Sequence, residues 1–414
     1  MIFIFVLFVI AILIHARVWG FFDLANPIVF MLDYHLFFLS LGVFVFYFNL
    51  YPAYEIQQIS LFLVLASYVV TTLSAFVTYF VIGKYIRLRL SSISYERFIS
   101  HSDVKSNILS DLFWVIGVLL TIAVVFKSGF SALLSMSAGE GFEDERVAAM
   151  SGNGILVIPA QIFLLVGTVW AVSRADRSFI TKASMFLVAV ICMVSFGFRS
   201  GVAFLVAICG LNYLYNKFGK VPSFKITIFA IFALSFFVFM GVLRKGEGDV
   251  LERFMASFFW RSFVTLYNLD VILSNYKDFL HGEGILMELA VIVPGPDINL
   301  GAHLKEVLGY DFPGGGITPS YIGAGYIDFG IWGAVLYPAF TGVLVASSYV
   351  LWPVFVGRSG LSFLLLLIFS VTTSGVSAAG FVSPYLYFGI PLFLLGLGVR
   401  LVLSMRLLMH KNNA

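Results

Sequence analysis

The stretch "MVSFGFRSGVAFLVAICGL", residues 193–211, contains a single charged side chain, Arg199, between two apolar runs. Such runs are typical of membrane-spanning helices, which need about 17–25 mostly apolar residues. The whole chain has the same character, since 60% of its 414 residues are hydrophobic, 17% are aromatic and only 11% are charged. This composition is far from that of a soluble domain, so the sequence predicts an all-α polytopic membrane protein.

Apolar runs of spanning length recur along the chain and predict about eleven transmembrane helices. The predicted spans are residues 2–16, 28–48, 59–82, 110–127, 154–173, 179–196, 200–216, 225–243, 330–352, 360–378 and 381–403. The first run lacks a basic start and a small-residue cleavage site, which favours a first span over a removed signal peptide. We expect a single integral membrane domain over residues 1–414, with a shorter loop at 128–153 and a large loop at 244–329.

Basic residues are distributed unequally between the two sides of the predicted spans. One side collects 16 of the 25 basic residues and six of the 22 acids, a charge of +10, and the other side keeps the rest, a charge of −7. Because cytoplasmic loops retain lysine and arginine, the positive side is predicted to be cytoplasmic. The N-terminus is then outside and the C-terminus inside, and both long loops and Arg199 face outward.

Arg199 lies between Gly197 and Gly201, where one predicted helix ends and the next begins. Free backbone N–H groups and the helix dipole favour an anion at a helix N-terminus, and a guanidinium adds bidentate contacts to phosphate. Snorkelling of Arg199 to the lipid headgroups is an equally good interpretation of this residue taken alone. Further basic residues predicted on the same face are Arg146, Arg244 and Lys245.

The segment "DVLERFMASFFWRSFVTLYNLD", residues 249–270, has a polar side chain at every fourth position and mostly apolar ones between them. This spacing predicts an amphipathic helix lying in the membrane interface. The polar positions are Asp249, Arg253, Ser257, Arg261 and Thr265. There are two alternatives for this polar stripe. Either all of it faces water, or Arg253 and Arg261 turn inward over a cavity shared with Arg199 and Arg244. The second arrangement would suit a ligand with several negative charges, such as a lipid pyrophosphate.

Motifs for nucleotide or metal chemistry are absent from the sequence. It contains no phosphate-binding G-x-x-x-x-G-K-[ST] loop, no H-x-x-x-H pair and no EF-hand spacing. Cys192 and Cys209 both lie in apolar runs, where a free thiol behaves as a small hydrophobic group. We expect no cofactor, no bound metal ion and no nucleic acid partner, with a loosely held divalent ion at the acidic 128–153 loop as the weaker alternative.

The large loop carries the remaining polar candidates. Candidate bases are Asp297, His303, Glu306, Asp311 and Asp328, and candidate sugar-binding groups are Tyr310, Thr318, Ser320, Tyr321 and Tyr326. Prolines and glycines at 294–296 and 313–316 predict turns within this loop. For any one of these residues a structural role is the alternative.

The stretch "GGGITPSYIGAGYIDFGIWGAVL", residues 314–336, resembles the Wzy-type oligosaccharide repeat-unit polymerases of O-antigen, exopolysaccharide and enterobacterial common antigen synthesis. In this family a Thr-Pro-Ser segment leads into a membrane helix through an aromatic-Gly-x-x-Gly stretch, here Phe329, Gly330 and Gly333. The related O-antigen ligases carry a His-Asn-type start where this chain has Pro319 and Ser320, which favours a polymerase over a ligase.

Two shorter patches support the resemblance. The stretch "FFDLANPIVFMLDYHLFF", residues 21–38, is similar to the family's Asp-x-x-x-Pro entry to the second span. Arg199 and Gly210 have the spacing of an arginine, ten residues and a glycine found in periplasmic motifs of these polymerases. No second copy of that spacing begins at Arg244, Arg253 or Arg261.

The resemblance implies a GT-C-like, metal-independent glycosyltransferase in the bacterial inner membrane that acts at its outer face on undecaprenyl pyrophosphate-linked saccharides. Arg199 and Arg244 would bind the donor pyrophosphate, and His303 or a carboxylate such as Asp328 would take the proton of the acceptor hydroxyl. A chain-length regulator and a flippase are implied partners. The alternatives are a transporter that flips the same lipid-linked oligosaccharide, an O-antigen ligase, and an auxiliary subunit without catalysis.

Overall fold

The computed structural model describes residues 2–21, 26–47, 56–87, 107–128, 154–174, 176–196, 199–218, 250–290, 300–311, 316–356, 360–374 and 380–412. Within these ranges every regular element is a helix. The predicted all-α architecture is confirmed.

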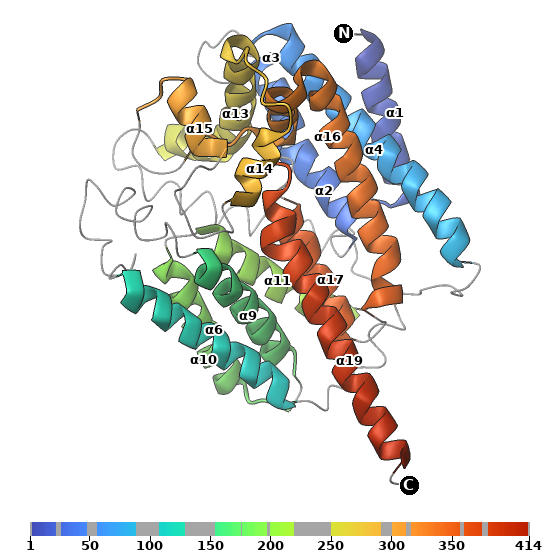
Figure 1. Ribbon diagram of the computed structural model, residues 1–414, viewed down its shortest axis with the longest axis vertical. Helices are drawn as coiled ribbons and strands as arrows, with labels where there is room; N and C mark the ends of the chain where they lie inside the picture. Colours follow the sequence, from blue (N-terminus) through green and yellow to red (C-terminus); the bar gives the residue numbers. More distant parts are fainter. Residues whose placement is uncertain are drawn as a thin grey trace.

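The helices are connected in a simple order along the chain (Figure 1). The first half contains α1 (Ile2–Val18), α2 (Pro27–His35), η1 (Leu36–Ser40), α3 (Leu41–Tyr47), α4 (Gln58–Arg87), α6 (Asn107–Ser128), α9 (Gly154–Ser173), α10 (Phe179–Ser195) and α11 (Arg199–Phe218). The second half contains α13 (Val250–Asn275), α14 (Glu283–Ala290), α15 (Leu300–Val307), α16 (Ser320–Phe355), α17 (Gly360–Thr373), η2 (Tyr385–Gly389) and α19 (Ile390–Asn412).

Ten of the eleven predicted spans coincide with apolar helices of the described residues, and the span at 225–243 lies outside them. Four of these helices, α4, α6, α9 and α16, are long and apolar enough to cross a bilayer, and the other apolar helices are shorter. The predicted span 28–48 is a continuous run of α2, η1 and α3 that begins where Asn26 accepts a hydrogen bond from the N–H of Ile28. A multi-pass protein is confirmed, while the count of eleven spans stays a prediction.

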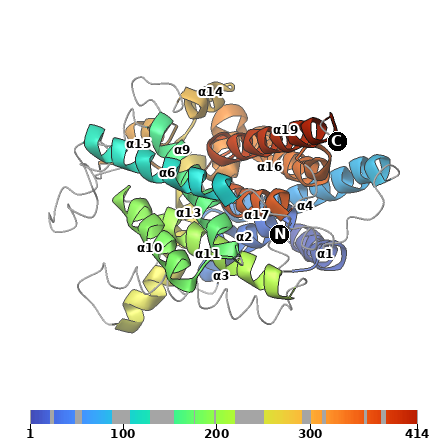
Figure 2. The ribbon, with the colours of Figure 1, turned by 90° about the horizontal axis from the view of Figure 1, so that it is seen from below.

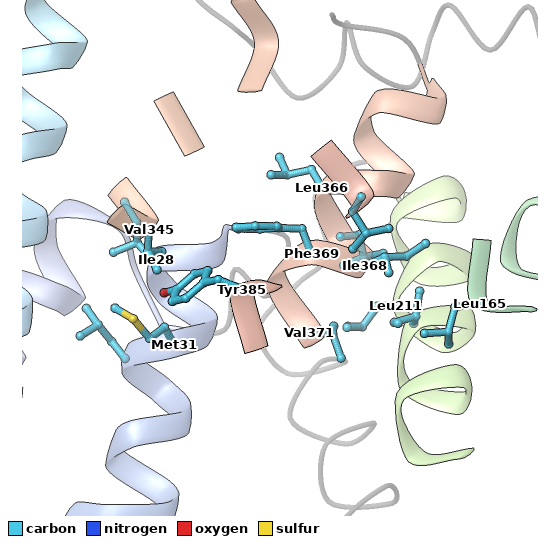
Figure 3. Packing of buried hydrophobic residues seen from close by; sticks show 14 of the residues in the cluster. Ile28, Met31, Leu165, Leu211, Val345, Leu366, Ile368, Phe369, Val371 and Tyr385 are labelled. Atoms are coloured by element: carbon cyan, nitrogen blue, oxygen red, sulfur yellow. The ribbon is translucent and has the colours of Figure 1, made fainter. Parts of the chain in front are cut away.

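Two groups of helices pack on either side of α17, as both views show (Figures 1 and 2). One group contains α1, α2, α4 and α16, and the other contains α6, α9, α10 and α11, while α13 packs against α3 and α16. Every residue from 361 to 374 is buried, which is the pattern of a helix that is apolar all round and enclosed by protein. Figure 3 shows Phe369 of α17 and Tyr385 of η2 between Ile28 of α2 and Leu211 of α11. Helix α17 therefore joins the two groups.

Helix α16 is a hairpin with two arms. Phe329 and Gly330 leave the helical conformation, and Gly330 has a φ of 63° and a ψ of −147° that suit only glycine. Backbone atoms of Gly325 and Gly333 touch, so that a Cβ on Gly325 would lie 2.1 Å from the carbonyl oxygen of Gly333. In a continuous helix residues eight apart are separated by about 12 Å. The chain therefore reverses at this point, and residues 320–328 form a buried half-helix, although the sequence placed them in the outer loop.

The ends of the chain lie at opposite ends of the molecule, with α13, α14 and α15 near the N-terminal end (Figure 1). Contacts between segments agree with the predicted sides. The carboxylate of Asp270 accepts a 3.0 Å hydrogen bond from the N–H of Gln57, and both residues were predicted on one side. Arg174 lies 3.5 Å from Asp111, and these two were predicted on the other side. The segregation of the loops into two sets is consistent with these contacts.

Candidate functional site

The candidate site lies where α13, α14 and α15 meet the turn of α16. Its residues are joined by a second apolar cluster, separate from the main core, that includes Ile272, Leu300, Leu304 and Ile327. Ile317, just before α16, is held against α15 by a 2.9 Å hydrogen bond from its N–H to the carbonyl of Gly301. The polar candidates of the large loop are therefore held on a packed scaffold.

Asp328 ends the first arm of α16 and is only 1% exposed. One carboxylate oxygen accepts a 2.9 Å hydrogen bond from the N–H of Gly284, and the other accepts one from the hydroxyl of Tyr337. Its carbonyl also accepts a hydrogen bond from the N–H of His281. Both carboxylate oxygens of this predicted catalytic residue are thus engaged by protein groups.

Two further buried carboxylates of the same region also bind helix N-termini. Glu288 accepts hydrogen bonds from three consecutive backbone N–H groups at 381–383, just before η2. Asp270 accepts hydrogen bonds from the N–H of Gln57 and the hydroxyl of Ser60 at the start of α4. The sequence analysis did not single out either residue, because their partners lie 93 and 213 positions away.

His303 is half-buried on α15, and its Nε2 lies 3.4 Å from the hydroxyl of Tyr276. Burial, followed by the charges of Asp328 and Asp278, raises the pKa of the Tyr276 phenol above its usual value of 10.0. The phenol is therefore protonated at neutral pH, and the tautomer of the His303 ring decides which of the two groups donates. In the tautomer that carries its proton on Nε2, the contact with Tyr276 orients the ring and leaves Nδ1 as the acceptor.

The predicted sugar-binding residues have different environments. Thr318 and Tyr326 are half-buried. The ring of Tyr326 contacts Phe279 edge-on. Ser320 is fully buried with a φ of 59°, an unusual conformation for a residue with a side chain. Tyr321 is also buried, and its hydroxyl lies 3.2 Å from that of Thr71.

Tyr321 belongs to a buried polar network that the sequence analysis missed. Thr71 is the central residue of the candidate span Gln58–Lys84, so the Tyr321 hydroxyl reaches the middle of that span. Nearby, His15 Nδ1 lies 2.9 Å from the hydroxyl of Tyr68, and His35 Nε2 lies 2.9 Å from that of Ser67. Polar side chains at this depth are costly unless they find partners within the protein. The sequence analysis did not identify Ser67, Tyr68 and Thr71 of α4, because the residues around them are mostly apolar.

The predicted arginine cluster falls largely outside the described residues. Arg199 is the first residue of α11, which confirms its predicted place at a helix N-terminus. The side chains of Arg199, Arg253 and Arg261 are not among those described, and Arg146, Arg244 and Lys245 lie in ranges outside the description. Their convergence stays a prediction.

The predicted amphipathic helix at 249–270 is present as α13, Val250–Asn275. Its described half packs against other helices, since Thr265 and Leu266 are fully buried and Phe263 stacks on Phe46. At least one position of the predicted polar stripe, Thr265, therefore faces the protein and not water.

Metal-binding groups do not gather within the described ranges. No three side chains of histidine, cysteine, aspartate or glutamate converge there. Cys192 and Cys209 are free thiols.

These features define a multi-pass helical membrane protein with a folded segment at one end. Residues 1–376 of the chain match the family described as "Putative O-antigen polymerase". The chain therefore belongs to the O-antigen polymerase family, whose members polymerise polysaccharides from lipid-linked saccharides in a membrane. No curated protein and no solved structure matches the chain.

Proposed function

We propose that this protein polymerises undecaprenyl pyrophosphate-linked oligosaccharide repeat units at the outer face of the bacterial inner membrane. The family match carries the proposal, because it extends over both the membrane helices and the folded segment between Val250 and the start of α16. A large segment on one side of the membrane suits an enzyme that acts on that side. The N-terminus would be outside and the C-terminus in the cytoplasm.

The proposed reaction transfers the growing glycan from its carrier to a new lipid-linked repeat unit. The bond between the anomeric carbon and the phosphate oxygen of the donor breaks, and its electron pair leaves with the undecaprenyl pyrophosphate. The terminal hydroxyl oxygen of the acceptor forms the new bond to that carbon and gives its proton to a base. Arg199 and Arg244 would bind the pyrophosphate and stabilise its developing charge. Further contacts would come from Arg146, Lys245, Arg253 and Arg261.

His303 is the base that we propose. It is half-buried next to Tyr276, whereas Asp328 is enclosed and has both oxygens engaged. A positioned base contributes about 10²–10⁴-fold to such a rate. Sugar contacts are assigned to Thr318 and Tyr326, which keep partial exposure, because Ser320 and Tyr321 are fully buried.

The proposed chemistry uses cationic side chains instead of a metal ion to offset the pyrophosphate charge. Treatment of the purified protein with EDTA should therefore leave the rate unchanged. A chain-length regulator and a flippase are the proposed partners in the cell.

The test is the glycan ladder that purified protein makes from lipid-linked repeat units. Arg199→Lys keeps the charge but loses the bidentate fork, so we expect impaired polymerisation, and Arg199→Ala should be nearly inactive at normal protein yield. Arg400→Ala, which changes an exposed arginine of α19 on the predicted cytoplasmic side, is the control and should polymerise normally. An Arg199→Ala protein with wild-type activity would refute the role of Arg199. Movement of the lipid across vesicles without any ladder would instead support the transporter alternative.

A further inference from the structure

Helix α14 is attached to the membrane helices at two points on one face. The N–H of Gly284 donates to Asp328 at the turn of α16, and the carboxylate of Glu288 accepts from the start of the η2 helix. Gly284 and Glu288 are four residues apart, which places them one above the other on the same side of a helix. Both attachments therefore hold the same face of α14.

The Asp328 attachment is closely fitted. A Cβ on Gly284 would lie 2.7 Å from one carboxylate oxygen of Asp328, so only glycine leaves room for the carboxylate there. The residues just before α14 are also held to α16, because the N–H of Leu280 donates a 2.9 Å hydrogen bond to the carbonyl of Ile327. The carboxylate that receives the Gly284 N–H also complements the positive end of the α14 dipole.

The Glu288 attachment is equally complete. Its oxygens accept hydrogen bonds of 3.1, 2.7 and 2.8 Å from the N–H groups of Phe381, Val382 and Ser383. The next residue is Pro384, which has no N–H, so Glu288 satisfies the free donors at the N-terminus of η2. Hydrogen bonds that involve a charged group are stronger than those between neutral groups.

Tyr337 closes a ring between the two carboxylates. Its hydroxyl donates to Asp328, and its ring stacks on Phe381 with centroids 4.2 Å apart. The N–H of Phe381 is in turn bound by Glu288. Helix α14 thus contacts α16 and the start of η2 through one continuous set of interactions.

We propose that Asp328 and Glu288 are positioning residues that clamp α14, and through it the His303-bearing helix α15, onto the membrane helices. The inference rests on the proposed function, because it assigns these carboxylates to holding the base and not to taking the proton. Helices α14 and α15 are in contact, and Leu304, next to His303, lies in the same apolar cluster as Tyr337 and Phe381. Loosening α14 would therefore displace His303 relative to the rest of the site.

The experiment compares hydrogen exchange and kinetics in four variants of the full chain. Glu288→Gln keeps the size of the side chain but loses acceptor capacity, and Glu288→Asp keeps the charge at a shorter reach. Asp328→Asn and Tyr337→Phe weaken the other attachment to different degrees. Glu283→Gln, which changes an exposed acid on the same helix, is the matched control.

We expect amide exchange in residues 283–290 and 381–383 to accelerate by about tenfold or more in Glu288→Gln, the change expected from the loss of a charge-assisted hydrogen bond. Exchange in Glu288→Asp should be intermediate, and Glu283→Gln should match the wild type. In the polymerisation assay the kcat of the Glu288 and Tyr337 variants should fall more than KM rises, because the clamp holds the base, with partial rescue in Glu288→Asp.

Two outcomes would overturn the clamp. Wild-type exchange in Glu288→Gln would show that Glu288 does not hold α14. Abolished turnover in Asp328→Asn, with wild-type exchange at 280–290, would make Asp328 a catalytic residue. The exchange data stand without any activity, so a wild-type protein that forms no ladder would refute the proposed function and leave the clamp to be judged on exchange alone.

Discussion

At the scale of single residues, the pairing of His303 with Tyr276 can be tested directly. Because His303 is the proposed base, His303→Gln should lower kcat by about 10²–10⁴-fold. Tyr276→Phe removes only the orienting hydrogen bond and should have a smaller effect, on the order of tenfold. The measurement is the initial rate of ladder formation at saturating lipid-linked substrate. His281→Gln, an exposed histidine in the same segment, is the control, and equal rates for His303→Gln and wild type would exclude His303 as the base.

The ion pair between Arg174 and Asp176 gives a prediction on pH. Arg174 donates to Asp176 over 3.0 and 2.6 Å, and this contact holds the pKa of the Asp176 carboxyl below its usual value. The stabilisation is therefore present above the unfolded pKa of about 3.9 and is lost as pH falls through the folded value. Asp176→Asn should melt earlier than wild type at about pH 6, and the gap should narrow as the pH falls below about 3.9. A gap that stayed constant with pH would mean that the pair does not stabilise the fold.

At the scale of elements, close packing between α6 and α9 depends on small residues. A Cβ on Gly167 would lie 2.4 Å from the backbone nitrogen of Trp114. Membrane helices gain stability from such backbone approach through van der Waals contact. Gly167→Ala should force the helices apart and cost about 1–3 kcal/mol of stability.

The control for Gly167→Ala is the same substitution at Gly398, where nothing lies within 4 Å. It accounts for the higher helix propensity of alanine. The measurement is thermal unfolding in detergent followed by tryptophan fluorescence. If the two variants melted at the same temperature, the close contact between α6 and α9 would not contribute to the stability of the fold.

At the scale of the whole molecule, the charge distribution and the contacts between loops make a prediction on topology. Asp278 is exposed at the end that carries α13, α14 and α15, whereas Lys84 is exposed near the end of α4. With residues 244–329 outside, Asp278→Cys should react with a membrane-impermeant thiol reagent in intact spheroplasts. Lys84→Cys should react only after the membrane is opened. The reverse pattern would invert the protein and remove the site from the outer face.

The sequence by itself determined the helical membrane class and the places of ten apolar helices within the described residues. Hydrophobic runs of spanning length are a local signal, because each helix satisfies its own backbone hydrogen bonds in the bilayer. The position of Arg199 at a helix start was also predictable from a local signal, because Gly197 and Gly201 on either side of it indicate a turn between two helices. The helical part of the large loop at α13 was likewise visible from its four-residue spacing.

Only the tertiary structure decided how these helices pair and what the buried polar groups do. Asp328, Glu288 and Asp270 each bind backbone groups of another helix, and such partners have no fixed spacing in the sequence. The reversal of α16 at Gly330 was also hidden, because a short half-helix and a loop rich in small residues have similar composition. Buried carboxylates are stable only where donors converge on them, and that convergence is a property of the fold and not of any local stretch of sequence.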